Sequence, residues 1–212
     1  MSAIAPDGRP LVGRVVRLDP TVPDDDTALF AALDDERVWA AGYGGGPAGR
    51  PGDAAGMRVT TAAAVRDREL GAGHPSYRMA YTVRLVADSE LGTAGTVVGT
   101  TSVGDIWLAD EKAHLGWTGY GPRWWATDVN PECKLLLLGH AFDDCGLGRV
   151  KLQTDLINTR SQAAIAKLGA TREGVLRRHK ARADGTFRDT VVFSILREDW
   201  PDVREGLLAR LG

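Results

Sequence analysis

The strongest structural signal in the chain is the stretch WWATDVNPECKL, which runs from Trp124 to Leu135. Asn130 is a favoured N-cap residue and Pro131 suits the first helical position, so a loop that opens a helix is predicted here. The first turn of a helix presents unpaired N–H groups and the positive end of its dipole, which together attract a phosphate or pyrophosphate. Lys134, one turn into the helix, would add a positive charge to such a site.

A second stretch, DLINTRS from Asp155 to Ser161, repeats this design. It follows an apolar strand pattern, and its polar residues precede a short helix that ends near Lys167-Leu168-Gly169. Two successive strand–cap–helix units predict two helix N-termini that open on one cleft.

Apolar periodicity outlines the other elements. We expect a mixed α/β (α+β) fold in one domain over residues 1–212, with a mostly antiparallel central sheet flanked by helices. The helix after Pro131 should connect two parallel strands, and a crevice should open where the sheet changes character. Residues 40–56, rich in Gly and Pro, are predicted to be a mobile loop that forms a lid over a substrate site. The predicted strands are Leu11–Leu18, Tyr77–Val86, Thr96–Leu108, His114–Tyr120, Arg149–Leu156, Ala170–Lys180 and Thr186–Leu196. One predicted helix starts at Pro23, and the others are Met57–Leu70, Pro131–Cys145, Thr159–Leu168 and Asp199–Leu211.

Composition excludes several classes of protein. Hydrophobic residues make up 43% of the chain, charged residues 25%, and the net charge is −2, which is typical of a globular protein without a nucleic-acid-binding footprint. The sequence has no apolar run of signal-peptide or membrane-spanning length, so a cytoplasmic protein without a membrane partner is expected.

The two cysteines, Cys133 and Cys145, lie in one predicted helix. Their Cα atoms would be about 18 Å apart, too far for a disulfide. Their spacing fits no metal site, so no metal is expected. Cys133 remains an alternative nucleophile because a helix N-terminus lowers a thiol pKa, although a small side chain packed in a helix is the preferred interpretation.

Several short motifs follow one another in a specific order: VGTT at 98–101, HLGW at 114–117, GHAF at 139–142, GRV at 148–150, DLINTRS at 155–161, KLGA at 167–170, EGVLR at 173–177 and EDW at 198–200. Their joint order resembles that of the GNAT (Gcn5-related N-acetyltransferase) superfamily, in particular the branch of ribosomal-protein alanine N-acetyltransferases. The resemblance spans Leu11 to Trp200 and implies the GNAT fold and an acyl-CoA-dependent N-acyltransferase.

The resemblance also implies where the acyl donor binds. Acetyl-CoA, or another acyl-CoA such as succinyl-CoA, would lie in a cleft between the fourth and fifth strands, with its pyrophosphate on backbone N–H groups of the loop before the central helix. The family pattern in that loop is Gln or Arg, two residues, Gly, one residue, then Gly or Ala. This chain has Trp125, Asp128 and Asn130 there, so the carboxylate of Asp128 must turn away from the phosphate. The implied cofactor-binding residues are Trp125, Ala126, Thr127, Asp128, Val129, Asn130, Lys134, Asn158 and Ser161, with hydrogen bonds from Thr127 and Asn130.

N-acylation needs a neutral amine, a polarised thioester carbonyl and a proton for the leaving thiolate. The resemblance implies catalytic roles for Asn158, which would contact the cofactor, and Ser161, which would protonate the thiolate. The structural alternative is that Asn158 caps a helix and Ser161 occupies its first turn. The general base stays open among His114, His179, Asp105 and water, since Lys180 stands where some relatives have Glu.

Two further groups of residues have open interpretations. The basic cluster Arg177, Arg178, His179, Lys180 and Arg182 is either a solvated strand end or a site for the CoA 3′-phosphate or an acidic substrate. The four tryptophans at 107, 117, 124 and 125 either pack in the core or, for Trp124 and Trp125, line a pocket.

The expected function is transfer of an acetyl group from acetyl-CoA to a primary amine of a protein N-terminus or a small molecule, without a covalent enzyme intermediate. A non-catalytic protein that binds CoA esters and an interaction module that has lost CoA are the alternatives. The partners are thus an acyl-CoA and an amine, and the dimers common among relatives imply a homodimer.

Overall fold

The structure, a computed structural model, describes residues 2–57, 67, 69–71, 74 and 77–212. The helix predicted over Met57–Leu70 falls largely outside these residues. One eight-stranded sheet runs through the described part of the chain in the order β1-β2-β3-β4-β5-β6-β8-β7. Its strands are β1 (Leu11–Val12), β2 (Val16–Pro20), β3 (Arg78–Leu85), β4 (Val97–Trp107), β5 (Lys112–Tyr120), β6 (Arg149–Asp155), β7 (Thr171–Ala181) and β8 (Phe187–Leu196).

All neighbouring strands are antiparallel except β5 and β6, which are parallel. This arrangement confirms the predicted mixed, mostly antiparallel sheet and the parallel pairing across the helix after β5. Parallel neighbours need a crossover connection, which α4 (Val129–Gly139) supplies.

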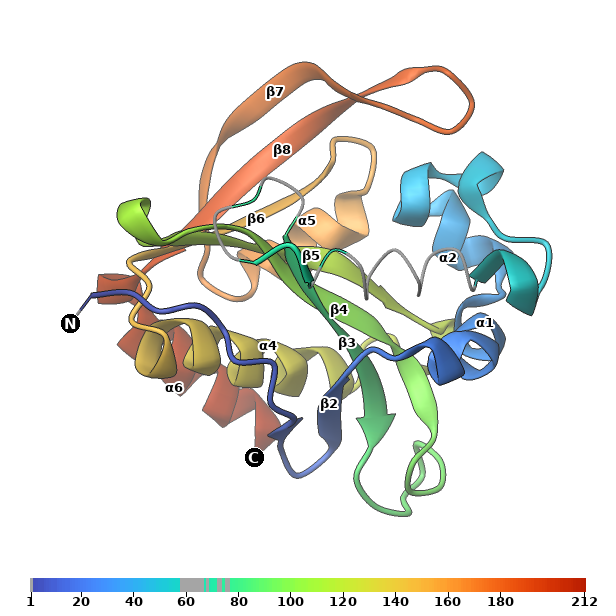
Figure 1. Cartoon of the computed structure of the whole chain (residues 1–212), viewed down its shortest axis with the longest axis horizontal. Coiled ribbons are helices and arrows are strands. Elements are labelled where there is room, and N and C mark those ends of the chain that lie inside the picture. The colour runs from blue at the N-terminus through green and yellow to red at the C-terminus, as the bar shows by residue number, and fades with distance from the viewer. Residues whose placement is uncertain (1, 58–66, 68, 72–73, 75–76) are drawn as a thin grey trace.

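The helices cover the sheet from different sides (Figure 1). In that view α4 and α6 (Trp200–Leu211) lie side by side below the sheet, and α5 (Thr159–Ala166) lies above it under the arched β7–β8 hairpin. The first residue of α6, Trp200, packs on the turn that follows α4, where the centroid of its ring lies 5.7 Å from that of Phe142. Two short helices, α1 (Asp26–Leu33) and α2 (Glu36–Ala40), lie at the end of the sheet where the hairpin tip reaches over them.

The single strand predicted over Leu11–Leu18 is wrong, because the chain turns after Val12 and forms the hairpin β1–β2. The buried carboxylate of Glu132, in the first turns of α4, stabilises this turn. It accepts three backbone hydrogen bonds, of 2.7 to 2.9 Å, from the N–H groups of residues 14, 15 and 16. The bonds join segments that are far apart in the sequence, so local periodicity carries no trace of them.

The predicted N-cap at Asn130 is also wrong. Helix α4 begins at Val129, Asp128 stands in the N-cap position without a side-chain capping bond, and Asn130 lies inside the first turn. Pro131 is tolerated there because first-turn N–H groups have no partner within the helix. The α-helix ends at Gly139 and is followed by a π-helical turn over His140–Asp144.

Candidate active site

The site begins where β5 and β6 separate. The two strands pair only from Lys112–Arg149 to His114–Lys151, although both continue beyond these residues. Just past this point β5 carries a bulge, in which two residues, Trp117 and Thr118, stand opposite one residue of β4. Trp117 has a left-handed φ of 49°, which a bulky residue rarely adopts without a structural reason. The bulge bends β5, and a gap opens between it and β6.

A cavity of about 670 Å³ fills this gap. Its walls are β5 from His114 onwards, β6 from Leu152 onwards, helix α5, the segment 124–126 and the start of α4. Residues of α2 and of the following 3₁₀ turns close it on another side, and the β7–β8 hairpin contributes three cationic side chains.

Six of the nine predicted cofactor residues lie around this cavity, and three do not. The hydroxyl of Thr127 donates a 2.8 Å hydrogen bond to the carbonyl of Trp124 and so supports the loop itself. Val129 is buried in the core, and Asp128 is exposed outside the lining, so its carboxylate does not face the cavity. The six that line the cavity are Trp125, Ala126, Asn130, Lys134, Asn158 and Ser161.

Lys134 is a buried cation beside the N-terminus of α4. Its side chain is 6% exposed, and its ammonium donates a 3.2 Å hydrogen bond to Oγ1 of Thr118. Burial lowers its pKa from 10.5 to about 8. Within the described residues it forms no ion pair with a carboxylate. A buried ammonium of this kind is costly unless an anion meets it, so the site fits a phosphate-bearing ligand.

Asn158 and Ser161 lie on the opposite side of the cavity, as a pair on one face of α5. Oδ1 of Asn158 accepts a 2.9 Å hydrogen bond from the N–H of Ser161, which confirms Asn158 as the N-cap of this helix. The other half of its amide, Nδ2, donates to the carbonyl of Ala41 just after α2. One side chain therefore joins α5 to the N-terminal wall of the cavity.

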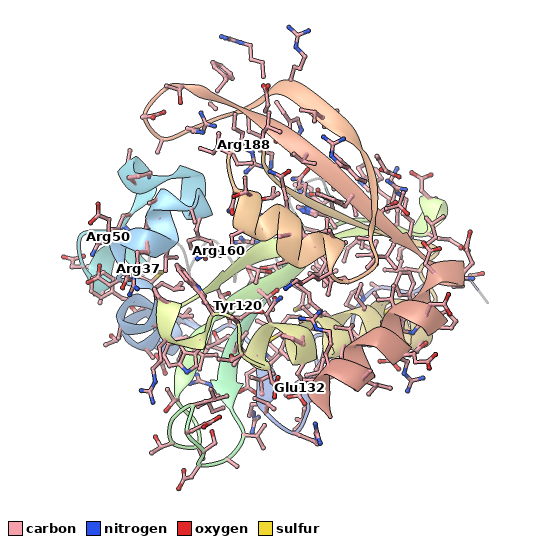
Figure 2. All side chains as sticks on the ribbon, turned by 180° about the vertical axis from the view of Figure 1, so that it is seen from behind. Arg37, Arg50, Tyr120, Glu132, Arg160 and Arg188 are labelled. Atoms are coloured by element: carbon pink, nitrogen blue, oxygen red, sulfur yellow. The ribbon has the colours of Figure 1, made fainter. Side chains whose placement is uncertain are left out.

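Arg160 connects the two sides across the cavity mouth. Its guanidinium lies 3.4 Å from the ring centroid of Trp125, and the indole N–H of Trp125 donates a 2.8 Å hydrogen bond to the carbonyl of Tyr120. Figure 2 shows Arg160 and Tyr120 on this side of the molecule, between α2 and α4. Burial lowers the pKa of Arg160. Local sequence pattern carries no sign of this contact, because it depends on how α5 and the loop meet in space.

The Gly-rich segment 40–56 forms part of the cavity wall. It contains two 3₁₀ turns, Tyr43–Gly45 and Pro47–Gly49, where an irregular loop was predicted. The ring of Tyr43 packs so closely on β5 that a Cβ at Gly119 would lie 2.8 Å from it. The sequence predicted a loop over a substrate site, and the structure shows that this segment forms part of the cavity wall.

The proposed general bases differ in their surroundings. Burial lowers the pKa of His114 to about 4, so its imidazole is neutral. Its Nδ1 lies 3.3 Å from Oδ2 of Asp105 without forming a well-aligned hydrogen bond, and its Nε2 has no hydrogen-bond partner among the described residues. Lys151 donates a 3.0 Å hydrogen bond to Asp105, which His114 and Lys151 keep ionised by lowering its pKa. His179 is exposed, bonds to Thr190 and does not line the cavity.

The tryptophans and the basic cluster divide between the cavity and other surfaces. Trp117, Trp124 and Trp125 line the cavity, whereas Trp107 is exposed elsewhere. Within the cluster, only Lys180 and Arg182 reach the cavity, while Arg178 stacks on Phe187 at 3.8 Å.

The cysteines do not form a nucleophilic site. Both are buried free thiols, and burial raises the pKa of Cys133 to about 12 and that of Cys145 to about 11. A thiol with so high a pKa is not a thiolate at neutral pH, which contradicts the alternative role of Cys133 as a nucleophile.

The described residues lack two other features. They contain no group of three or more His, Cys, Asp or Glu side chains that would hold a metal ion. None of the helices in the described part of the chain has the length and apolarity to cross a membrane.

Comparison with known proteins identifies the family. The family model for the acetyltransferase (GNAT) domain matches residues 16–171. A T. thermophilus protein assigned as an acetyltransferase is 32% identical, with full coverage of both chains and a TM-score of 0.80. A GCN5-related N-acetyltransferase from Brucella melitensis is 23% identical over 100% of this chain and 89% of its own, with a TM-score of 0.84.

A third solved structure, Mycobacterium smegmatis RimJ in complex with CoA-disulfide, shares the fold at 20% identity, with a TM-score of 0.76 over 99% of this chain and 97% of its own. No curated protein sequence gives a significant match. The family model covers well over half of the chain, and a protein above 30% identity spans all of it. The chain therefore belongs to the GNAT family of acyl-CoA-dependent N-acetyltransferases.

Proposed function

We propose that this N-acetyltransferase takes acetyl-CoA as its donor and acylates the primary amine of a protein N-terminus or of a small molecule. The observation that carries the proposal is the cavity between β5 and β6, which has the buried Lys134 on one side and Ser161 on the other. We further infer that the chain belongs to the ribosomal-protein N-acetyltransferase branch, which the order of its motifs favours.

The residues around the cavity fit CoA. The N–H groups at the start of α4, with Asn130 beside them, would bind the pyrophosphate. The ammonium of Lys134, which has no carboxylate partner among the described residues, would form an ion pair with the same phosphate groups. The exposed side chain of Asp128 does not oppose this, since it lies outside the cavity lining. A CoA thioester supplies the activated acyl group.

The chain's own residues would then assist direct transfer to the amine. The bulge at Trp117 and Thr118 offers backbone groups outside the regular ladder, which are suited to polarise the thioester carbonyl. As the C–N bond forms and the C–S bond breaks, the hydroxyl of Ser161 would give its proton to the leaving thiolate and recover one from the amine nitrogen, which loses a proton on becoming an amide. Burial lowers the pKa of His114 to about 4, so we assign the imidazole no role as a dedicated base. The amine would instead react from its neutral form, having lost its ammonium proton to the solvent before it binds.

Calorimetric titration tests the donor. Purified protein would be titrated with CoA, acetyl-CoA and succinyl-CoA, and each should bind at about one site per chain, with acetyl-CoA supporting transfer to an amine panel. The absence of binding by all three would reject the proposal.

The variant Ser161→Ala tests the catalytic assignment, with Thr159→Ala as its matched control. Both hydroxyls lie in the first turn of α5, but only that of Ser161 faces the cavity. Ser161→Ala should lower kcat at least tenfold while the Kd for CoA changes less than threefold, and Thr159→Ala should change neither. An unchanged kcat in Ser161→Ala would remove this residue from the mechanism.

A further inference from the structure

The part of the cavity lined by the β7–β8 hairpin has a charge pattern that CoA binding leaves unexplained. Lys180 on β7 and Arg188 on β8 are direct cross-strand partners, and both line the cavity. Cationic side chains directly opposite each other in an antiparallel pair repel, so this pair is unfavourable unless an anion lies between them. Figure 2 shows Arg188 beneath the arch of the hairpin, far from Tyr120 at the phosphate-loop end.

Two carboxylates lie near this pair, since Asp105 raises the pKa of Lys180 and Asp155 raises that of Arg188, but each already has another cationic partner. Arg182 already occupies the carboxylate of Asp155, with hydrogen bonds of 2.8 and 3.1 Å to Oδ2. On the β6 side, Lys151 occupies the carboxylate of Asp105. The His114 imidazole nearby is neutral, and His179 and Thr190 bond to each other. Around this pair, Asp105 and Asp155 therefore face four cations, Lys151, Lys180, Arg182 and Arg188, and both carboxylates are already hydrogen-bonded.

The same end of the cavity lies away from the CoA phosphates. Lys180 acts electrostatically on His114, the residue at which β5 and β6 stop pairing, whereas the phosphate loop follows the other end of β5 after Tyr120. Six residue steps of strand separate His114 from Tyr120, which is about 20 Å. A donor whose phosphates sit at the loop would therefore direct its reactive end, and the acceptor, toward Lys180 and Arg188.

Crowding by like charges supports this assignment. The pKa of Lys180 is lowered by partial desolvation and by the neighbouring charges of Arg188 and Lys151, which outweigh the opposite effect of Asp105. Burial also lowers the pKa of Arg188, with Asp155 acting against this shift and Arg182 adding to it. The guanidinium of Arg188 donates a 3.0 Å hydrogen bond to the neutral hydroxyl of Thr190. An anion bound between the two side chains would relieve this repulsion.

We propose that Lys180 and Arg188 form a carboxylate-binding subsite that selects an anionic reactant, and this rests on the proposed function. The carboxylate belongs either to the acyl group of the donor, as in a dicarboxylic acyl-CoA, or to the amine acceptor, as in an acidic peptide N-terminus or an amino acid. Both sources place the same group beside the reacting atoms.

Matched pairs of ligands distinguish the two sources. For the donor, calorimetry compares succinyl-CoA with acetyl-CoA. For the acceptor, it compares 4-aminobutyrate with its amide, and an aspartyl with an asparaginyl tripeptide amide, each in the presence of saturating CoA. We expect the carboxylate member of at least one pair to bind at least tenfold more tightly, and this ratio should fall as salt is raised.

The variants Lys180→Gln and Arg188→Gln, singly and together, test the residues. The double variant should reduce the tenfold ratio to below threefold. Arg177→Gln is the matched control, because Arg177 is an exposed cation of the same strand outside the cavity lining, and it should keep the wild-type ratio.

Two results would overturn the subsite: no pair discriminated by more than threefold in the wild type, or discrimination that survives the double substitution. Failure of CoA itself to bind is a different result, since it would reject the proposed function.

Discussion

Lys134 gives a prediction in which stability and affinity change in opposite directions. Its ammonium is 6% exposed and has a pKa near 8, against 10.5 for an ordinary lysine. A pKa difference of this size between the folded and the unfolded chain lowers the free energy of unfolding by about 3 kcal/mol at a pH where Lys134 is charged in both states. Lys134→Met keeps the length of the side chain and removes the charge. The free protein should therefore become more stable at pH 7, by up to about 3 kcal/mol.

The pH dependence follows from the same shift. Between pH 8 and 10.5 the unfolded chain binds a proton at Lys134 that the folded chain does not, so wild-type stability rises with pH in this window. The advantage of Lys134→Met should shrink over the same range. Urea unfolding at pH 7, 8.5 and 10 measures the difference in stability between Lys134→Met and the wild type. Lys167→Met is the control, because Lys167 is an exposed lysine at the end of α5.

Binding should change the other way. A charge-assisted hydrogen bond to a phosphate is worth about 1.5 to 3 kcal/mol, so Lys134→Met should weaken CoA binding by roughly ten- to a hundredfold. Calorimetry measures this Kd. A variant less stable than the wild type at pH 7 would refute the cost assigned to burial, and a Kd changed less than twofold would refute the assignment of this ammonium to the phosphate.

Two further predictions concern buried groups. Glu132→Gln should destabilise the protein by about 2 to 4 kcal/mol in urea unfolding, because an amide cannot accept three backbone hydrogen bonds with its NH2 half; a loss below 0.5 kcal/mol would contradict a role for the carboxylate in the β1–β2 turn. The pKa of His114 is lowered from 6.5 to about 4, so the folded state disfavours the protonated imidazole. The corresponding contribution to the free energy of unfolding, about 3 kcal/mol, is present above pH 6.5 and is lost as the pH falls to 4. His114→Gln should flatten that part of the stability profile, and an NMR titration in which the His114 imidazole becomes protonated near pH 6.5 would contradict the assignment.

Most of the sheet and helix order follows from local pattern. In β3, Met79, Tyr81, Val83 and Leu85 stand at every second position, and the β7–β8 hairpin has its turn at Asp184-Gly185, so the period and the turn residues were sufficient to predict these elements. The errors arose where distant groups decide the backbone. The turn after Val12 depends on Glu132, and the N-cap of α4 is Asp128, two residues before the predicted Asn130.

The features of the site also fall into those that local sequence predicts and those that depend on contacts between distant segments. Asn158 could be predicted because capping is a local property with a clear residue preference. Contacts such as that of Arg160 on Trp125, or the ring of Tyr43 against Gly119, join segments whose spacing in the sequence carries no period. Backbone geometry also decided which loop residues face the cavity, so Thr127 and Asp128 could not be separated from Asn130 by residue type.

The amide of Asn158 has an evolutionary consequence. A helix N-cap usually tolerates exchange among Asp, Ser, Thr and Asn, because each offers an oxygen to the first-turn N–H groups. Here the same side chain must also donate to the carbonyl of Ala41, which asks for an acceptor and a donor held apart by one planar group. Asp would set a carboxylate against that carbonyl, and Ser is too short to reach both. Sequence drift at position 158 should therefore be confined to Asn, even in descendants whose substrate has changed.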